Sequence, residues 1–477
     1  MLTRNTLRTT GFAQRLSRLA GAAVIALTLP HMAQSQTLAD ALAGAYTHSG
    51  LLEQNRALLR AADEDVAGTV ARLRPILSWT TDITRSFSRI PGAFGGSTRS
   101  GDTDLNAGIV AEWLLYDFGR SRFQVDAAKE TVLATRQALV SIEQQVMLRA
   151  VQAFMNVQRT TRFVTLRQSN VRVIRESLRA AQDRFEVGEV TRTDVAQAEA
   201  RLSLAVSGLA SAQGDLAQAI EEYIAVVGSR PARHLQSPRI PSITRTQETA
   251  KQIALRNHPD MLKAQHDVAA ADLNVLVAEA AMSPQITLNG ALAVNEQLDG
   301  SSYSQSGSVG IQLSGPIYQG GALSSAKRRA IAQRDALRGL LHTTGNNVAR
   351  NVGNAYAILA AARASSAAST DGVRAARVAF EGVNEEAKLG ARTTLDVLNA
   401  EQELLTSQAD QISAQVDLVI AAYAVLSATG QLTVRDLNLN VPTYDPTSYY
   451  NLVKDAPAEY SKQGQQLDKV LRAIGKQ

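Results

Sequence analysis

The chain contains Val187-Gly188-Glu189-Val190-Thr191-Arg192-Thr193-Asp194-Val195 and, 202 positions later, a second version of it, Leu389-Gly390-Ala391-Arg392-Thr393-Thr394-Leu395-Asp396-Val397. The same offset relates five further pairs of like residues: Tyr116 and Tyr318, Phe154 and Tyr356, Ala198 and Ala400, Glu199 and Glu401, and Leu202 and Leu404. A period this long indicates a duplicated half, because solenoid repeats run about 20–50 residues. Each version has Gly followed by Thr-x-x-Asp, which is typical of one helix ending and another beginning. The sequence therefore predicts two copies of one long helical hairpin.

The spacing of proline supports long helices on both sides of each repeated segment. None of the 12 prolines falls between Pro91 and Pro231 or between Pro316 and Pro442, and proline is excluded from helix interiors. Between Arg120 and Val187 there is also no glycine, which predicts one helix about 100 Å long. Apolar residues recur at spacings of three, four or seven along these tracts, as in a coiled coil. The second hairpin is expected to descend over 322–388 and to return over 393–429, and it contains more glycine, which disfavours a helix.

The N-terminus reads as a secretory signal peptide rather than as part of the fold. Four arginines precede the apolar run 19–29, Pro30 ends it, and Ala33 and Ser35 suit a cleavage site before Gln36. The apolar run is too short to cross a membrane, although an uncleaved N-terminal anchor is the alternative. Without residues 1–35 the formal net charge falls from +5 to +1, so basicity gives no reason to expect a nucleic-acid partner. The chain has no cysteine, which excludes disulfides and thiolate metal sites. No other stretch is expected to form a transmembrane helix.

Four segments between the helical tracts alternate apolar and polar residues with a period of two. They are 77–88, 103–116, 285–296 and 305–317, and the segments 89–102 and 297–304 between them are rich in Gly and Ser and are expected to be loops. Period two over about ten residues is the pattern of a transmembrane β-strand. Four aromatic residues are placed as an interfacial girdle would be: Trp79, Trp113, Tyr116 and Tyr318. Two soluble amphipathic hairpins packed on a core are the alternative. Because four strands cannot close a barrel, the membrane interpretation requires an oligomer.

These patterns predict an organisation in eight parts. Helices over 37–72 and 248–282 are expected to lead into the strands, and the tail after Val434 is expected to be irregular, and peripheral or partly disordered. The parts are a signal peptide (1–35), a lead-in helix (36–74), a first transmembrane β-hairpin (75–118), a first coiled-coil hairpin (119–230), a linker with a lead-in helix (231–283), a second transmembrane β-hairpin (284–318), a second coiled-coil hairpin (319–430) and a C-terminal tail (431–477).

Catalytic and metal-binding motifs are absent from the sequence. The six histidines are scattered, and there is no His-Glu-x-x-His, Gly-x-Ser-x-Gly, phosphate loop or Rossmann fingerprint. His258 and His266 share a predicted helix without a third ligand, so both are interpreted as structural or exposed. We therefore expect no enzymatic activity, no cofactor and no metal site.

Taken together, these features resemble the TolC family of outer membrane efflux and secretion proteins over essentially the whole mature chain. The two repeated segments carry the resemblance best, with Tyr116-Asp117-Phe118-Gly119, Tyr318-Gln319-Gly320-Gly321, Asn257-His258-Pro259-Asp260-Met261-Leu262 and Asp445-Pro446. The resemblance implies an α+β membrane protein that acts as a homotrimer, in which three protomers with four strands each build a transmembrane β-barrel continuous with a helical α-barrel. It also implies a location in the outer membrane of a Gram-negative bacterium, with the helical part in the periplasm.

The resemblance assigns roles to residues of the two repeated segments. Arg392 looks like a gate arginine that links to Thr193 and Asp194 of a neighbouring protomer, and Asp396 looks like part of a carboxylate ring. Asn399 stands where the family has a second pore carboxylate, and Ala387 where it has a gate tyrosine, so we expect fewer links in this gate. From the residues alone, Asp194 and Asp396 are helix caps. The residues expected to contact a periplasmic adaptor are Val187, Gly188, Thr191, Leu389, Gly390 and Thr393.

The function that these observations predict is a trimeric exit duct through the outer membrane. Its expected partners are a periplasmic adaptor, an inner-membrane transporter of the ABC or RND class, and outer membrane lipid. A periplasmic structural coiled-coil protein without a pore is the main alternative, and a secreted enzyme on a helical scaffold lacks a candidate nucleophile. The sequence leaves open whether the cargo is protein or small molecules.

Overall fold

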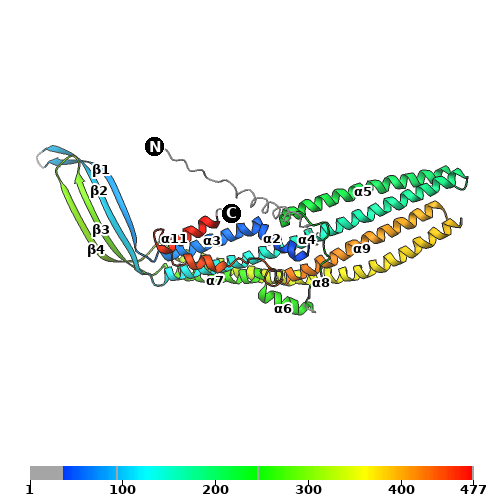
Figure 1. The fold of residues 1–477 in the computed structure, drawn as a ribbon. Coiled ribbons are helices and arrows are strands. Elements are labelled where there is room, and N and C mark those ends of the chain that lie inside the picture. The colour runs from blue at the N-terminus through cyan, green and yellow to red at the C-terminus, as the bar shows by residue number, and fades with distance from the viewer. Residues whose placement is uncertain (1–35, 93–94, 244–245, 475–477) are drawn as a thin grey trace, which may run out of the picture.

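The molecule is long and narrow, with a β-sheet at one end and two helical hairpins at the other (Figure 1). The computed structural model describes residues 36–92, 95–243 and 246–474, so the predicted signal peptide lies outside the described residues. Shorter helices surround the middle of the molecule, between the sheet and the hairpins. The same order of elements, short helices, two strands and two long helices, occurs once in each half of the chain.

The four long helices follow the sequence prediction closely. Helices α4 (Arg120–Glu186) and α8 (Ala322–Lys388) each contain 67 residues, and each begins after a glycine in the left-handed region. They pair with the returning helices α5 (Arg192–Val227) and α9 (Thr394–Ala428). The four lie side by side in the order α5, α4, α9, α8 (Figure 1). The glycines of α8 do not interrupt it, because packing against α9 outweighs a cost of about 1 kcal/mol per glycine.

The sequence analysis expected no transmembrane helix beyond the N-terminus, and helix α9 bears on that expectation. By length and composition α9 is apolar enough to cross a membrane. In the structure it is the returning helix of the second hairpin, and its apolar residues pack against α4 and α8.

A four-stranded antiparallel sheet forms the other end of the molecule, in the order β1-β2-β3-β4. Its strands are β1 (Ile76–Gly92), β2 (Gly96–Tyr116), β3 (Gln285–Gln297) and β4 (Tyr303–Ser314). The expectation that 89–102 forms a loop was wrong, because pairing continues from Ile76 with Glu112 to Gly92 with Gly96. Cross-strand contacts between serines and an arginine, such as Arg89 Nε donating to Ser97 Oγ at 3.0 Å, occur within this polar part of the ladder. Backbone hydrogen bonds hold a strand whatever its side chains.

The lead-in segments are each two helices instead of the single helices expected. The first consists of α2 (Leu38–His48) and α3 (Gly50–Ala71), and the second of α6 (Gln247–Asn257) and α7 (Pro259–Ala280). At both breaks the connecting residue is in the extended region and caps the next helix. Ser49 Oγ accepts from the Leu52 N–H, and His258 Nδ1 accepts from the Asp260 N–H. Proline at the start of α7 cannot donate a helical hydrogen bond, which fixes the second break.

The C-terminal segment contains two helices and contacts the body, so the expectation that it is irregular was wrong. It contains α10 (Pro446–Val453) and α11 (Lys462–Ile474). Leu432 and Val453 are fully buried, and the Val434 N–H donates to Glu143 Oε1 at 2.7 Å.

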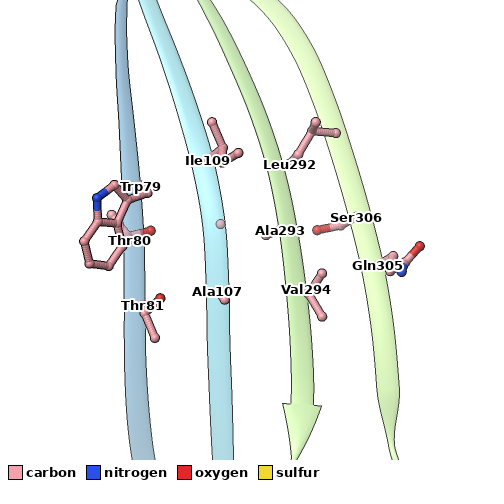
Figure 2. Close-up of a pocket in the computed structure, with 11 residues that line it drawn as sticks. Trp79, Thr80, Thr81, Ala107, Ile109, Leu292, Ala293, Val294, Gln305 and Ser306 are labelled. Carbon is pink, nitrogen blue, oxygen red and sulfur yellow. The ribbon is translucent and has the colours of Figure 1, made fainter. Parts of the chain in front are cut away.

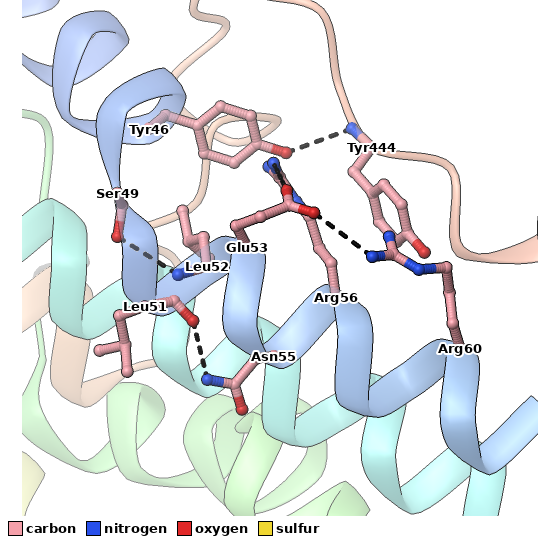
Figure 3. A network of polar contacts seen from close by, with 9 residues as sticks. All are labelled: Tyr46, Ser49, Leu51, Leu52, Glu53, Asn55, Arg56, Arg60 and Tyr444. Carbon is pink, nitrogen blue, oxygen red and sulfur yellow. Dashed lines mark hydrogen bonds and ion pairs between the residues drawn. The ribbon is translucent and has the colours of Figure 1, made fainter. Parts of the chain in front are cut away.

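Figure 3 shows how the same segment is held against α2 and α3. The Tyr444 N–H donates to Tyr46 Oη at 3.2 Å, and the Arg56 guanidinium lies 5.0 Å from the centre of the Tyr46 ring and 5.3 Å from that of Tyr444. Glu53 bonds Arg56 and Arg60 from the same helix. The contacts of Tyr444 join residues about 400 positions apart, so no local pattern reveals them.

Candidate functional site

The repeated segments form two tips at the end of the molecule farthest from the sheet (Figure 1). Gly188 (φ 80°) and Gly390 (φ 78°) are in the left-handed region, which ends each descending helix. Thr191 and Thr393 then cap the returning helices. Asp194 Oδ2 accepts from the Thr191 N–H at 2.9 Å, and Asp396 Oδ2 accepts from the Thr393 N–H at 3.0 Å. The reciprocal bonds from the aspartate N–H groups to the threonine hydroxyls complete two capping boxes, as the sequence predicted.

The electrostatics of the tips follow from these caps. Hydrogen bonds from the Thr191 backbone and hydroxyl lower the pKa of Asp194, and those from Thr393 lower the pKa of Asp396 in the same way. Both carboxylates therefore stay ionised at helix N-termini, where negative charge is favoured. Arg392 Nε donates to Glu386 Oε2 of its own chain at 2.8 Å, and this contact raises the pKa of Arg392.

Of the remaining residues predicted for the tips, some are exposed and others contact the other hairpin. Val187 and Leu389 project with 71% and 86% of their surfaces exposed, and Thr193 is also exposed. Asn399 Oδ1 accepts from Arg201 Nη2 at 3.0 Å, so it connects the two hairpins. Ala387 is buried, and its carbonyl accepts from Arg184 at 3.4 Å.

Further polar links join the hairpins above the tips, and sequence reasoning missed all of them. Asn170 Nδ2 donates to Glu401 Oε1 at 2.9 Å in a buried contact. The Glu401 side chain is 6% exposed, and its other oxygen has no hydrogen-bond partner. Burial raises the pKa of Glu401 to about 7, partly offset by the hydrogen bond from Asn170. The one signal in the sequence is the 202-residue offset, which pairs Glu401 with Glu199. In the structure Glu199 is exposed, whereas Glu401 is buried.

Two more links lie farther along the same pair of helices. Arg159 Nη2 on α4 bonds Asp417 Oδ1 on α9 at 2.5 Å. Arg162 Nη1 donates to Gln415 Oε1 at 3.0 Å. With the Asn170 contact, these bonds fasten α4 to α9 along much of the length that the two hairpins share.

At the opposite end, the sheet has one apolar and one polar face. Residues paired across strands share a face, and the register sets Trp79 opposite Ile109 and Ile109 opposite Leu292. On the other face Asp82 lies opposite Asn106, and the Asn106 amide donates to Asp82 Oδ2 at 3.0 Å. The alternation predicted from the sequence is confirmed. An apolar outer face and a polar inner face are what a transmembrane barrel requires.

Of the aromatic residues predicted for the membrane interface, Trp113, Tyr116 and Tyr318 lie where the strands give way to the helical part, and Trp79 lies in β1 opposite Ile109. Trp79 and Tyr318 are 78% and 86% exposed. Trp113 is partly exposed, and its Nε1–H donates to the Leu73 carbonyl, which ties β2 to the end of α3. The Tyr116 and Phe118 rings lie 4.9 Å apart where β2 ends.

A shallow hollow of about 470 Å³ crosses the middle of the sheet, and all four strands contribute to its lining (Figure 2). Its lining includes the apolar side chains of Trp79, Ile109, Leu292 and Val294 and the hydroxyls of Thr80, Thr81 and Ser306. No charged side chain lines it, and polar groups that would orient a ligand do not converge there. Among the described residues no group of three His, Asp or Glu side chains could hold a metal ion.

A protomer with an amphipathic four-stranded sheet at one end and two long helical hairpins at the other is typical of membrane channel proteins. The family model described as "Outer membrane efflux protein" matches residues 42–229 and 250–431. The chain belongs to this family. It is an outer membrane efflux channel of the TolC type, located in the outer membrane of Gram-negative bacteria, and a transport protein rather than an enzyme.

Named relatives agree with this assignment. The chain is 36% identical over 427 residues to the outer membrane efflux protein BepC of Brucella suis biovar 1, covering 89% of this chain and 91% of that protein. It is 25% identical over 382 residues to the alkaline protease secretion protein AprF of Pseudomonas aeruginosa, covering 77% and 79%.

Solved structures show the same fold. The chain of CusC aligns with a TM-score of 0.72 at 19% identity, covering 83% of this chain and 92% of that one. The CmeC outer membrane channel of Campylobacter jejuni aligns with a TM-score of 0.73 at 16% identity, covering 88% and 90%.

Proposed function

We propose that three copies of this chain form a channel-tunnel that serves as the exit duct of a tripartite efflux or type I secretion system. One observation carries the proposal: the sheet has two free edges, β1 and β4, while its outer face is apolar. A membrane-spanning sheet must close on itself, because lipid cannot satisfy unpaired backbone groups. Twelve strands from three copies close the barrel, and the helices extend it through the periplasm. The division of the chain into eight parts, given above, is part of this proposal.

The tips are the proposed contact with a periplasmic adaptor. Val187 and Leu389 are large apolar side chains exposed at the turns of the two hairpins, and such exposure is typical of binding surfaces. Gly188, Thr191, Gly390 and Thr393 shape the two turns that present them. Through the adaptor the duct is coupled to an inner-membrane transporter of the ABC or RND class, since the duct itself has no source of energy. Relatives named for protease secretion and for solvent efflux leave both kinds of cargo open.

The entrance is proposed to close at the same tips. In the trimer, Arg392 reaches Thr193 and Asp194 of the neighbouring protomer, while Asp396 and Asn399 lie around the constriction. Within one chain Arg392 is paired with Glu386, so the gate link competes with a bond that is already present. An exposed ion pair contributes only about 0–1 kcal/mol, and three symmetric copies act on one opening.

Single-channel conductance in planar bilayers tests the duct and its gate together. We expect Arg392→Ser to raise the resting conductance without lowering the yield of trimer. Arg192→Ser, at the other tip, is the matched control and should leave conductance unchanged. Equal conductance in wild type and Arg392→Ser would show that packing alone closes the entrance. A trimer with no conductance in any variant would instead favour a periplasmic coiled-coil protein without a pore.

A further inference from the structure

The hairpin of β1 and β2 continues beyond the part of the sheet that all four strands share. Pairing of β2 with β3 ends at Asp104 and Gln297, whereas β1 and β2 stay paired as far as Gly92 and Gly96. This extension lies at the end of the sheet farthest from the helices (Figure 1). In the proposed channel, whose helices extend into the periplasm, it therefore lies at the outer surface of the membrane.

The register sorts the charges of this hairpin by face. Residues paired across strands share a face. Three arginines lie on the face that carries Trp79: Arg85, Arg89 and Arg99. Three acids lie on the opposite face: Asp82, Asp102 and Asp104. Because the Trp79 face is the apolar one, the arginines lie on the side that meets lipid and the acids on the side that lines the channel.

The arginines begin where the apolar band of the sheet ends. The outer face of β2 carries only Leu, Ala, Ile and Trp from Leu105 to Trp113. Eight residue steps of about 3.3 Å, at a strand tilt of about 40°, span about 20 Å of the membrane, which is most of the ~25 Å apolar band of such barrels. Arg85 is two residues beyond Ile83, which pairs with Leu105. In the proposed barrel Arg85 therefore lies at the depth of lipid headgroups, and Arg89 lies about 10 Å farther out.

No described carboxylate neutralises the three arginines. The Arg85 guanidinium lies 5.4 Å from the centre of the Phe87 ring, and Arg89 Nε donates to Ser97 Oγ at 3.0 Å. All three arginines are exposed, and none forms an ion pair with a carboxylate of the described residues. Their charge is therefore available to a partner outside the chain.

The acids nearest to the arginines are placed differently. Glu296 is on the outer face of β3, but it pairs with Leu105 and so lies on the membrane side of the arginines. Asp299, in the turn after β3, accepts a hydrogen bond from the Thr103 hydroxyl. Asp102 Oδ1 accepts from Gln297 Nε2 at 3.0 Å on the inner side. None of these acids lies between Arg89 and Arg99, which are paired directly.

The direct pairing of Arg89 with Arg99 indicates that an anion binds between them. Side chains opposite each other on adjacent strands are about 5 Å apart at Cβ, and like charges in this position are destabilising. A bound anion replaces this repulsion by charge-assisted hydrogen bonds from both guanidinium groups. Phosphate suits the site, because a guanidinium donates to two phosphate oxygens at once.

We propose that Arg85, Arg89 and Arg99 bind the phosphate groups of lipids in the outer leaflet of the membrane. The inference rests on the proposed function, since it takes the apolar face of the sheet as the lipid side of a barrel. The apolar band contacts the acyl chains, and the arginines continue the same face at the level of the headgroups of the same lipids. The site thereby holds the barrel at one depth in the membrane.

Binding of a phosphorylated lipid to the purified full-length trimer tests the site. The probe is lipid A with two phosphate groups, added in a neutral detergent, and the bound lipid is counted by native mass spectrometry. We expect the triple variant Arg85→Gln, Arg89→Gln and Arg99→Gln to retain less lipid A by about tenfold or more. Asp102→Asn with Asp104→Asn, at the same level on the inner face, is the matched control and should retain as much as the wild type. Equal retention by the triple variant and the wild type would overturn the proposal.

Two further probes separate the phosphate from the rest of the lipid. Dephosphorylated lipid A, with the same acyl chains, should be retained weakly and to the same extent by the wild type and the triple variant. Inorganic phosphate should not displace lipid A from the wild type, because it lacks the acyl chains that contact the apolar band. Strong retention of the dephosphorylated lipid, or displacement by inorganic phosphate, would contradict a site for a lipid phosphate.

The repulsion between Arg89 and Arg99 gives a second measurement. Without lipid, Arg89→Gln should raise the temperature at which the trimer dissociates in detergent, because the like charges no longer face each other. Lipid A should raise this temperature for the wild type and much less for Arg89→Gln. An equal rise in both proteins would contradict the inference and leave the proposed duct intact. A chain that is absent from the outer membrane and forms no trimer would instead contradict the proposed function.

Discussion

The two hairpins of this chain have the same backbone and different surroundings. Their descending helices are equal in length, and their tips have the same turn and the same cap. The first hairpin is covered along α4 by α2, α3, α7 and the C-terminal segment, and most of the buried core belongs to it. The second is mainly covered by α6 and α7 near its base. Duplication therefore preserved what defines the turns, while the packing of the two copies diverged.

The largest effect is expected on thermal stability, from alanine substitution at the paired residues Phe154 and Tyr356. Phe154 is completely buried in the main core, and Tyr356 is only partly buried. Replacing a buried Phe by Ala costs about 3–5 kcal/mol, so Phe154→Ala should lower the unfolding temperature of the helical part much more than Tyr356→Ala. Thermal unfolding followed by circular dichroism measures both. Equal losses would mean that the second hairpin is covered in the trimer as fully as the first.

An intermediate effect, dependent on pH, is expected from the pair Glu401 and Glu199. The pKa of buried Glu401 is raised from 4.5 to about 7. The loss of folding free energy caused by this buried carboxyl is therefore absent below pH 4.5, grows as the pH rises and is complete above about pH 7. Glu401→Gln should therefore stabilise the trimer at pH 8, by at most about 3 kcal/mol, and have little effect at pH 4.5. Glu199→Gln should change neither value, because Glu199 is exposed. The temperature at which the trimer dissociates is measured at pH 4.5 and at pH 8. A higher dissociation temperature for Glu401→Gln at pH 4.5 would contradict this explanation.

The smallest effect is expected at the tips, where the two hairpins should behave alike. Both glycines have positive φ, and a Cβ added to Gly188 or Gly390 meets no atom within 4 Å. The cost of alanine is then that of the backbone alone, about 1 kcal/mol, or about fivefold in the opening of the turn. Amide hydrogen exchange at the tips should accelerate by this factor in both variants. A difference between the two would show that one tip is held by contacts that the other lacks.

The long helices and the strand alternation could be read from the sequence because they depend on local signals. Absence of proline sets the reach of α4 and α8, and Gly followed by Thr-x-x-Asp marks each tip. The break at Ser49 escaped notice because a capping serine followed by glycine is too weak a signal within an otherwise helical segment. The docking of Tyr444 onto α2 and α3 depends on contacts between the two ends of the chain, which no local pattern encodes.

For the candidate site, sequence reasoning found the turns and missed the links between hairpins. Asp194 and Asp396 were recognised because a cap lies within four residues of its partner. The bonds of Asn170, Arg159 and Arg201 join residues 231, 258 and 198 positions apart, and their spacing on each helix resembles that of any exposed polar face. Only the comparison of the two copies, once the neighbouring helices are known, separates these residues from ordinary surface ones.

The equal length of α4 and α8 has a consequence for how this chain can change. Each inserted residue would advance a tip by about 1.5 Å and turn it by about 100° around its helix. A single insertion in one copy would therefore move one turn out of the plane of the other and face its cap in a different direction. Insertions that keep both tips in one plane must come in whole pairs of turns, about seven residues, on both limbs of a hairpin and in both copies at once. The reach of the duct across the periplasm is thus set in coarse steps, and the two halves of the chain must lengthen or shorten together.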